Sequence, residues 1–155
     1  KWLTYPTRQE LPLLAEAAQA SLKEIGIEVD INNTLDVNEV VQDASAWDVY
    51  AMANVQAPTG DPEYWFRVFA LSDSAKNQGK YSNAQLDALD EQLSQEFDTA
   101  KRADLAVQMQ QILLDDNAFV FCSFLKMSMI SRSNVSNYTS HACDYYQITA
   151  DLDIE

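Results

Sequence analysis

The sequence predicts an α/β fold, a mixed sheet with flanking helices, and two observations support this. Short apolar runs alternate with segments whose apolar residues recur at helical spacing. The first helical segment also separates two strand-like runs, at 1–5 and 27–31, an order that favours parallel pairing. A length of 155 residues suits one domain, so a single core is expected.

Thr7 and Glu10 have the spacing of a capping box at the start of the first helix, and Gly26 suits the position just past its end. A second, short helix follows. The next strand is expected over 47–53, where apolar residues dominate.

The second half of the chain is predicted to contain a pair of antiparallel helices over 83–114. Ser82 is expected to open the first helix in a capping box, and Asp98 is expected to cap the second. Each helix carries an apolar stripe that predicts burial. The stripes comprise Leu86, Leu89, Leu93, Phe97, Leu105, Met109, Ile112 and Leu113.

Three strand-like runs close the chain, at 119–124, 127–132 and 147–154. The first of them lacks polar alternation, which predicts a central strand buried on both faces. The sheet is therefore expected to combine these three strands with the first three, and the helix pair is expected to pack on it.

Residues 54–66 form the segment most typical of a ligand site. They follow a predicted strand, and two prolines and a glycine force the chain to turn. Asp61 is expected to cap a short helix with Pro62 at its first position. A loop that leads from a strand into a helix N-terminus and is flanked by aromatic rings suits a small ligand. The simpler expectation for most of these rings, Tyr64, Trp65 and Phe69, is that they anchor the helix in the core.

The composition and the reactive residues exclude several functions. A net charge of −14 disfavours a nucleic-acid partner, and the chain has neither a transmembrane run nor a signal peptide, which favours a cytosolic protein or a fragment. Cys122 is expected to be a buried free thiol, while His141 and Cys143 are too few for a zinc site. An α/β hydrolase or transferase that uses Asp61 as acid or base is an alternative, but the sequence offers no second titratable partner. No enzyme activity, catalytic residue or cofactor is therefore expected.

Several motifs, in their order and spacing, give the chain a resemblance to a known family. They are Ile25-Gly26-Ile27-Glu28-Val29, Gly60-Asp61-Pro62, Tyr81-Ser82-Asn83, the run over 110–116 and Tyr145-Tyr146. The chain resembles the carboxy-terminal lobe of bacterial solute-binding proteins of the peptide and nickel import family, and the resemblance covers nearly all of it. It implies that residues 1–155 are a single ligand-binding lobe of a longer, two-lobed protein that closes on a solute.

The family also implies where the solute binds, because its loop ahead of the Asp-Pro pair faces the ligand cleft. Dipeptide and oligopeptide binders neutralise the peptide amine with an aspartate where this chain has Pro58, and a tryptophan often stacks on the ligand at the position of Val55. The histidine that some nickel-type members use as a metal ligand has no counterpart near Asp73. Nickel in a chelate is therefore favoured, bound without metal ligands from this lobe, and a peptide is the alternative. The candidate ligand-binding residues are Asn54, Val55, Gln56, Ala57, Pro58, Thr59, Gly60, Asp61, Tyr64 and Tyr145.

The resemblance further implies a membrane permease of an ATP-driven (ABC) importer as partner. It implies a monomer in the periplasm, or at the cell surface as a lipoprotein.

Overall fold

The structure is a computed structural model that describes residues 1–126, 128–141 and 148–154. Its contacts divide into two compact units, Lys1–Asn54 and Val55–Glu155, and each unit has its own buried residues. The single core expected from chain length is therefore replaced by two groups of buried side chains. That the two units form one ligand-binding lobe stays a prediction.

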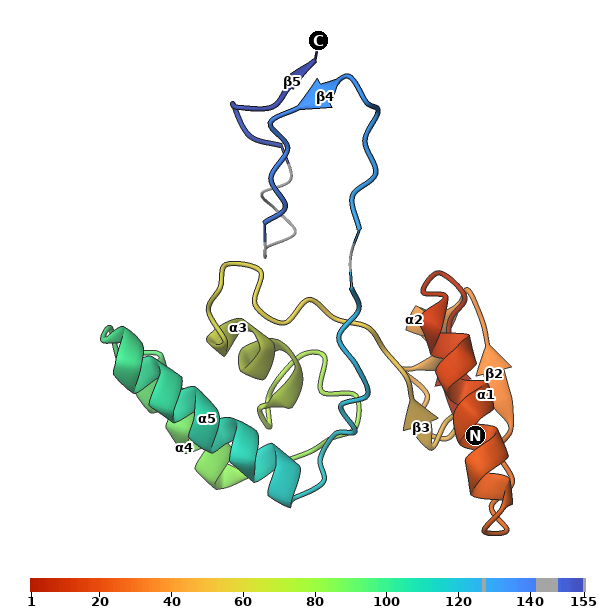
Figure 1. Cartoon of the computed structure of the whole chain (residues 1–155). Helices are drawn as coiled ribbons and strands as arrows, with labels where there is room; N and C mark the ends of the chain where they lie inside the picture. The colour runs from red at the N-terminus through yellow and green to blue at the C-terminus, as the bar shows by residue number, and fades with distance from the viewer. Residues whose placement is uncertain (127, 142–147, 155) are drawn as a thin grey trace. The chain divides into compact units, whose positions relative to one another are not determined.

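The first unit is built on a parallel sheet (Figure 1). Its strands are β1 (Trp2–Thr4), β2 (Ile31–Asn33) and β3 (Val49–Tyr50), in the order β2-β1-β3. The parallel pairing of the first two strands is confirmed, with Trp2 opposite Ile31. The strand expected over 27–31 lies later in the chain, and β3 is shorter than the expected 47–53. All three strands end at the same edge of the sheet because they run in the same direction.

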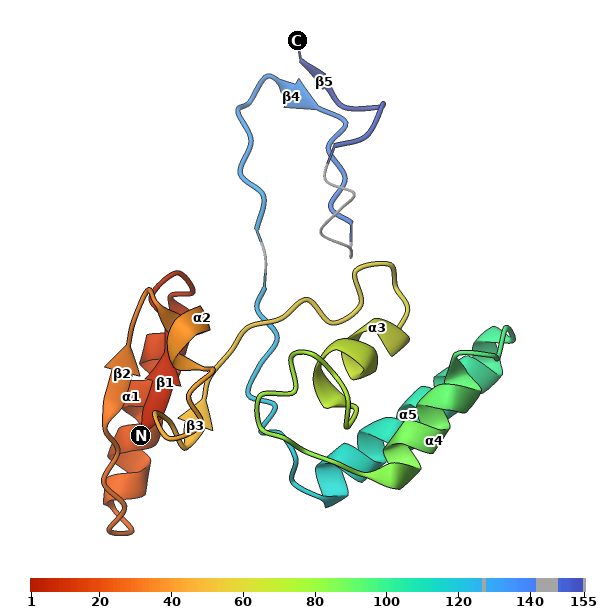
Figure 2. The ribbon, with the colours of Figure 1, turned by 180° about the vertical axis from the view of Figure 1, so that it is seen from behind.

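Two helices complete the first unit. Helix α1 (Glu10–Lys23) packs against β1 and β2, as Figure 2 shows from behind, and α2 (Val37–Val40) contributes to a cluster around Leu3. The capping box expected for α1 does not form, since the helix begins after Gln9 without a side-chain cap. Gly26 adopts a φ of +83°, the left-handed conformation expected of a glycine that follows a helix.

The second unit begins with a loop, a short helix and a π-helical turn. These are α3 (Glu63–Trp65) and η1 (Phe66–Ala70), so the expected helix begins two residues after Asp61. The connection over 73–80 contains a buried polar residue, Asn77. Its side chain bonds the backbone of Leu71 and Tyr81, which satisfies its polar atoms inside the unit.

Helices α4 (Ala84–Leu93) and α5 (Thr99–Asp115) pack side by side, which confirms the predicted helix pair (Figure 1). The cap of α4 is Asn83 rather than Ser82, because the Asn83 side chain accepts from two amides. Asp98 caps α5 as predicted. Phe97 is 91% exposed, and the reason is that α4 ends at Leu93, which takes Phe97 out of the helical register of the stripe. The buried stripe residues are Leu86, Leu89, Leu93, Met109 and Leu113.

The last part of the chain differs most from the expectation. Strands β4 (Val135–Ser136) and β5 (Asp153–Ile154) form a separate antiparallel pair, so the last strands do not join the first sheet. No strand covers 119–124, whose Phe124 is 81% exposed, and Cys122 is exposed rather than buried. A doubly buried strand needs partners for its backbone groups, and no described strand pairs with this segment. Positions 127 and 147, which belong to the other two expected strands, lie outside the described residues.

Among the described residues, no helix is long and apolar enough to cross a membrane.

Candidate functional site

The predicted ligand segment starts at the carboxyl edge of the first unit's sheet. Strands β2 and β3 lie on opposite sides of β1, and in open α/β sheets ligands bind where the strand order reverses in this way. Just beyond β3, the amide of Ala53 donates to the hydroxyl of Tyr5, at 3.1 Å. Asn54, the last residue of the unit, is exposed at this end of the sheet.

Two tyrosines lie at this edge, and the sequence reading did not include them. Tyr5 directly follows β1, and Tyr50 ends β3. Burial, together with the proximity of Tyr5, raises the pKa of Tyr50 to about 12, so its hydroxyl is neutral over the physiological range. The signal for Tyr5 was its place at the end of a predicted parallel strand, since the carboxyl ends of parallel strands share one edge.

The second unit begins with Val55, which is 39% exposed, and continues into a tight turn over 57–60. The amide of Gly60 donates to the carbonyl oxygen of Ala57, at 3.0 Å, and Gly60 has a φ of +83°. Proline is favoured at the second position of such a turn, which Pro58 occupies. Pro58 is buried, Gln56 is partly buried, and Ala57, Thr59 and Gly60 are exposed.

The aromatic residues after the turn divide into one exposed and several buried rings. Tyr64 is 42% exposed, whereas Trp65 and Phe69 are buried. The Trp65 ring lies within 6.0 Å, centroid to centroid, of four other rings, those of Phe66, Phe69, Phe119 and Phe121. The expected role as core anchors is confirmed for Trp65 and Phe69 and is wrong for Tyr64. Tyr145, the remaining aromatic candidate, lies outside the described residues.

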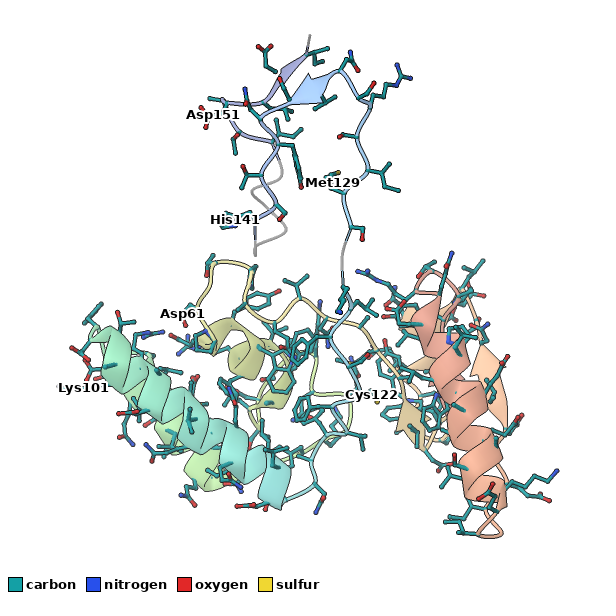
Figure 3. The ribbon with its side chains drawn as sticks, in the orientation of Figure 1. Asp61, Lys101, Cys122, Met129, His141 and Asp151 are labelled. Carbon is teal, nitrogen blue, oxygen red and sulfur yellow. The ribbon has the colours of Figure 1, made fainter. Side chains whose placement is uncertain are left out.

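Asp61, labelled in Figure 3, links the turn to α3 and α5. One of its carboxylate oxygens accepts from the amide of Glu63, at 2.9 Å, so Asp61 bonds the first residue of α3, although Pro62 rather than Asp61 directly precedes the helix. Both oxygens also accept from Nη2 of Arg102, at 2.9 and 2.7 Å. Burial by itself raises the pKa of Asp61, but the hydrogen bonds from Arg102 and Glu63 and the charge of Arg102 outweigh it and lower the pKa. A carboxylate held ionised in this way is a poor general base near neutral pH.

Arg102 is the functional candidate that the sequence reading missed. Its side chain is only 18% exposed, and besides Asp61 it reaches the carboxylate of Glu63, at 2.8 Å. Its other terminal nitrogen, Nη1, donates to the carbonyl oxygens of Leu93 and Glu96, at 2.6 and 2.8 Å. Hydrogen bonds to Glu63 and to Asp61 raise the pKa of Arg102 above its ordinary value. Sequence spacing gives no signal for this contact because Asp61 and Arg102 are 41 positions apart.

The ionic contacts continue from Glu63 to α4. Arg67 contacts Glu63 at 3.0 Å and Asp90 at 3.1 Å. Burial raises the pKa of Asp90 and prevails over the attraction of Arg67. We call Asp61, Glu63, Arg67, Asp90 and Arg102 the ionic network.

Two hollows of about 510 Å³ each lie elsewhere in the second unit. One is lined by residues of α4 and α5, and the other lies beside η1. Neither is lined by a predicted ligand residue. Among the described residues, no three or more His, Cys, Asp or Glu side chains are grouped to hold a metal ion.

Comparison with known proteins connects this fold to one class. No family model matches the chain. The chain is 30% identical over 138 residues to the nickel-binding protein NikA of Staphylococcus aureus, which covers 89% of this chain and 28% of NikA. The crystal structure of that protein in complex with Ni(L-His)2 matches with a TM-score of 0.78 and 26% identity, over 99% of this chain and 33% of that one.

Two further solved structures are also similar to this chain. A nickel ABC transporter protein from Bacillus halodurans has a TM-score of 0.78 and 28% identity, with 99% of this chain and 33% of that chain covered. A putative peptide binding protein, AppA, from Clostridium difficile has a TM-score of 0.62 and 31% identity, with 74% of this chain and 24% of that chain covered. The chain thus spans about a third or less of the length of these relatives.

The fold and these similarities define an α/β part of a solute-binding protein. The chain is a homologue of the solute-binding proteins of the peptide and nickel import family and corresponds to one part of such a protein. The resemblance inferred from the sequence motifs is therefore confirmed.

Proposed function

We propose that the chain is the carboxy-terminal ligand-binding lobe of the substrate-binding component of an ABC importer, and that the solute is nickel in a chelate. The observation that carries this proposal is the similarity to nickel-binding relatives over nearly the whole chain. The protein carries out no reaction, and any metal is cargo rather than a resident cofactor. On this proposal the solute meets the segment from Asn54 to Gly60, together with Tyr64 and Tyr145.

The charges beside the turn favour a chelate over a free peptide. Residues 55–63 contain two ionisable side chains, Asp61 and Glu63, and both accept hydrogen bonds from Arg102. The position of Pro58, where peptide binders carry an aspartate, adds no carboxylate. A peptide amine at this loop would therefore meet no unpaired negative charge. Its own positive charge would stay unpaired, which in a closed site costs roughly several kcal/mol. A nickel chelate with no free amine at this point avoids that cost.

A peptide solute is the second candidate, and its support is the 31% identity to the putative peptide binding protein. In that case a carboxylate from the part of the relatives that this chain does not span would neutralise the amine. Both candidates imply a permease as partner, a monomeric binding protein and an extracytoplasmic location, either periplasmic or as a surface lipoprotein.

A thermal-shift screen of the complete protein separates the two solutes. We expect nickel with L-histidine to raise the unfolding temperature, because a ligand at 100 times its Kd stabilises a protein by about 2.7 kcal/mol. L-histidine without nickel is the matched control and should give no shift. Strong stabilisation by unmodified di- or tripeptides, with none by nickel and L-histidine, would show that the solute is a peptide.

A further inference from the structure

The turn over 57–60 is closed by a backbone hydrogen bond and contains one buried residue, Pro58. Ala57, Thr59 and Gly60 are exposed, and the next residue is Asp61. The end of the turn is held in addition by the contacts made by Asp61. Those contacts are the Glu63 amide, which is local, and Arg102, which comes from another helix.

Arg102 connects three elements through its two terminal nitrogens. Nη2 bonds Asp61 at the end of the turn and Glu63 at the start of α3. Nη1 bonds the carbonyl oxygens of Leu93 and Glu96, at the end of α4 and in the connection to α5. The Leu93 carbonyl also accepts from the amide of Glu96, at 3.3 Å, so Arg102 adds a second donor where α4 ends. One guanidinium thus ties the tight connection between α4 and α5 to the end of the turn.

The planar guanidinium is the side chain suited to this position. It has five N–H donors in a fixed fork and remains charged at any physiological pH. A lysine has a single ammonium centre on a flexible stem, and it would not hold a carboxylate pair and two carbonyls in one geometry. Its neighbour Lys101, labelled in Figure 3, is 70% exposed and pairs only loosely with Glu96, at 3.8 Å. The two adjacent cations therefore differ in their surroundings although they share a helix turn.

We propose that Arg102 is a positioning residue for solute binding, which fixes the turn over 57–60 by anchoring Asp61 to the α4–α5 connection. This inference rests on the proposed function for its effect on affinity. The effect on the turn itself does not depend on the identity of the solute. Arg102 does not touch the solute in this proposal, since both of its terminal nitrogens are occupied by protein oxygens.

The first test measures amide hydrogen exchange of the complete protein without solute. In Arg102→Gln we expect the amide of Gly60, which donates to the carbonyl oxygen of Ala57, to exchange about tenfold faster, because the turn opens more often when its end is released. The matched control is Lys101→Gln, which removes one positive charge from the same helix turn and should leave this exchange unchanged. Exchange in the middle of α5 should change in neither variant. Equal exchange at Gly60 in both variants, or a rise of the same size throughout α5, would overturn the positioning role.

The second test measures affinity by calorimetry with nickel and L-histidine, well below the unfolding temperature of each variant. We expect Arg102→Gln to bind about tenfold more weakly than wild type, Arg102→Lys to be intermediate and Lys101→Gln to match wild type. Asp61→Asn keeps the acceptor for the Glu63 amide but loses the charge that Arg102 neutralises, so its effect should not add to that of Arg102→Gln. Wild-type affinity in Arg102→Gln would contradict the inference. Absence of binding by wild type would contradict the proposed solute instead, and the exchange measurement would still decide the role of Arg102.

Discussion

The turn over 57–60 and the ionic network that follows it have opposite characters. The turn carries no charge and exposes Ala57, Thr59 and the backbone of Gly60. The ionic network contains three carboxylates and two guanidinium groups, and its Asp90 side chain is 5% exposed. The charges near the predicted ligand segment are thus paired with one another inside the second unit. On the proposals made above, the turn offers shape and backbone groups to the solute, while the network holds the turn in place.

The buried and exposed rings of α3 allow the sharpest test of this division. Trp65→Ala should lower the free energy of unfolding by about 3–5 kcal/mol, because it removes a ring that packs against four others. Tyr64→Ala should change it by less than about 1 kcal/mol, because the ring is 42% exposed. Urea unfolding measures both. A larger loss for Tyr64→Ala than for Trp65→Ala would show that the ring assignments are reversed.

The two carboxylates at the ends of the network should respond to pH in opposite directions. The pKa of Asp61 is lowered on folding, so its contribution to stability is present above its unfolded pKa and is lost as pH falls through the folded value. The pKa of Asp90 is raised on folding, so its favourable contribution is present at low pH and is lost as pH rises through the folded value.

Asp61→Asn should therefore destabilise the protein near neutral pH, by less than about 1 kcal/mol because solvent screens a side chain that is 42% exposed, and the loss should shrink in acid. Asp90→Asn should be neutral or stabilising near neutral pH, and any gain should also shrink in acid, where the wild-type carboxyl is protonated. Thermal unfolding followed across the acid range tests this pair. Destabilisation by Asp90→Asn at neutral pH that matches the effect of Asp61→Asn would mean that the bond from Arg67 outweighs the burial of Asp90.

Two glycines provide the smallest and most local comparison. An added Cβ would meet no atom within 4 Å at Gly60 or at Gly79, so neither site has a steric conflict with its neighbours. Gly60 alone of the two has a positive φ, of +83°, and alanine there should cost about 1 kcal/mol of stability. Gly79→Ala should be neutral or stabilising by up to about 1 kcal/mol, since it restricts the unfolded chain. Equal effects of the two substitutions on the unfolding midpoint would show that the left-handed conformation of Gly60 is not maintained.

Much of the local structure could be predicted from the sequence because it depends on neighbouring residues. The α4–α5 pair was predicted from stripes at helical spacing, and Asp98 was predicted as a cap from its position before α5. The turn was predicted from its prolines and its glycine, whose backbone preferences act within a few residues. The parallel pairing of β1 with β2 followed from the helix between them.

The apolar run over 119–124 illustrates the limit of this reasoning. Its composition favours a buried strand, but a strand forms only when other strands satisfy its backbone groups. The described strands of this chain pair elsewhere, and Phe124 is left 81% exposed. The predicted burial of Phe97 was wrong for a related reason. Phe97 would lie in the apolar stripe only if α4 continued past Leu93, where the helix ends.

The sequence by itself thus determined the helices, the turn and the family, since these depend on local spacing and on ordered motifs. Only the tertiary structure decided which charges meet. Arg102 pairs with Asp61 across 41 positions, and Arg67 with Asp90 across 23. Such pairs form because burial makes an unpaired charge costly, so each carboxylate is held by whichever cation the packing of the helices brings near. That selection acts through space and leaves no periodic signal along the chain.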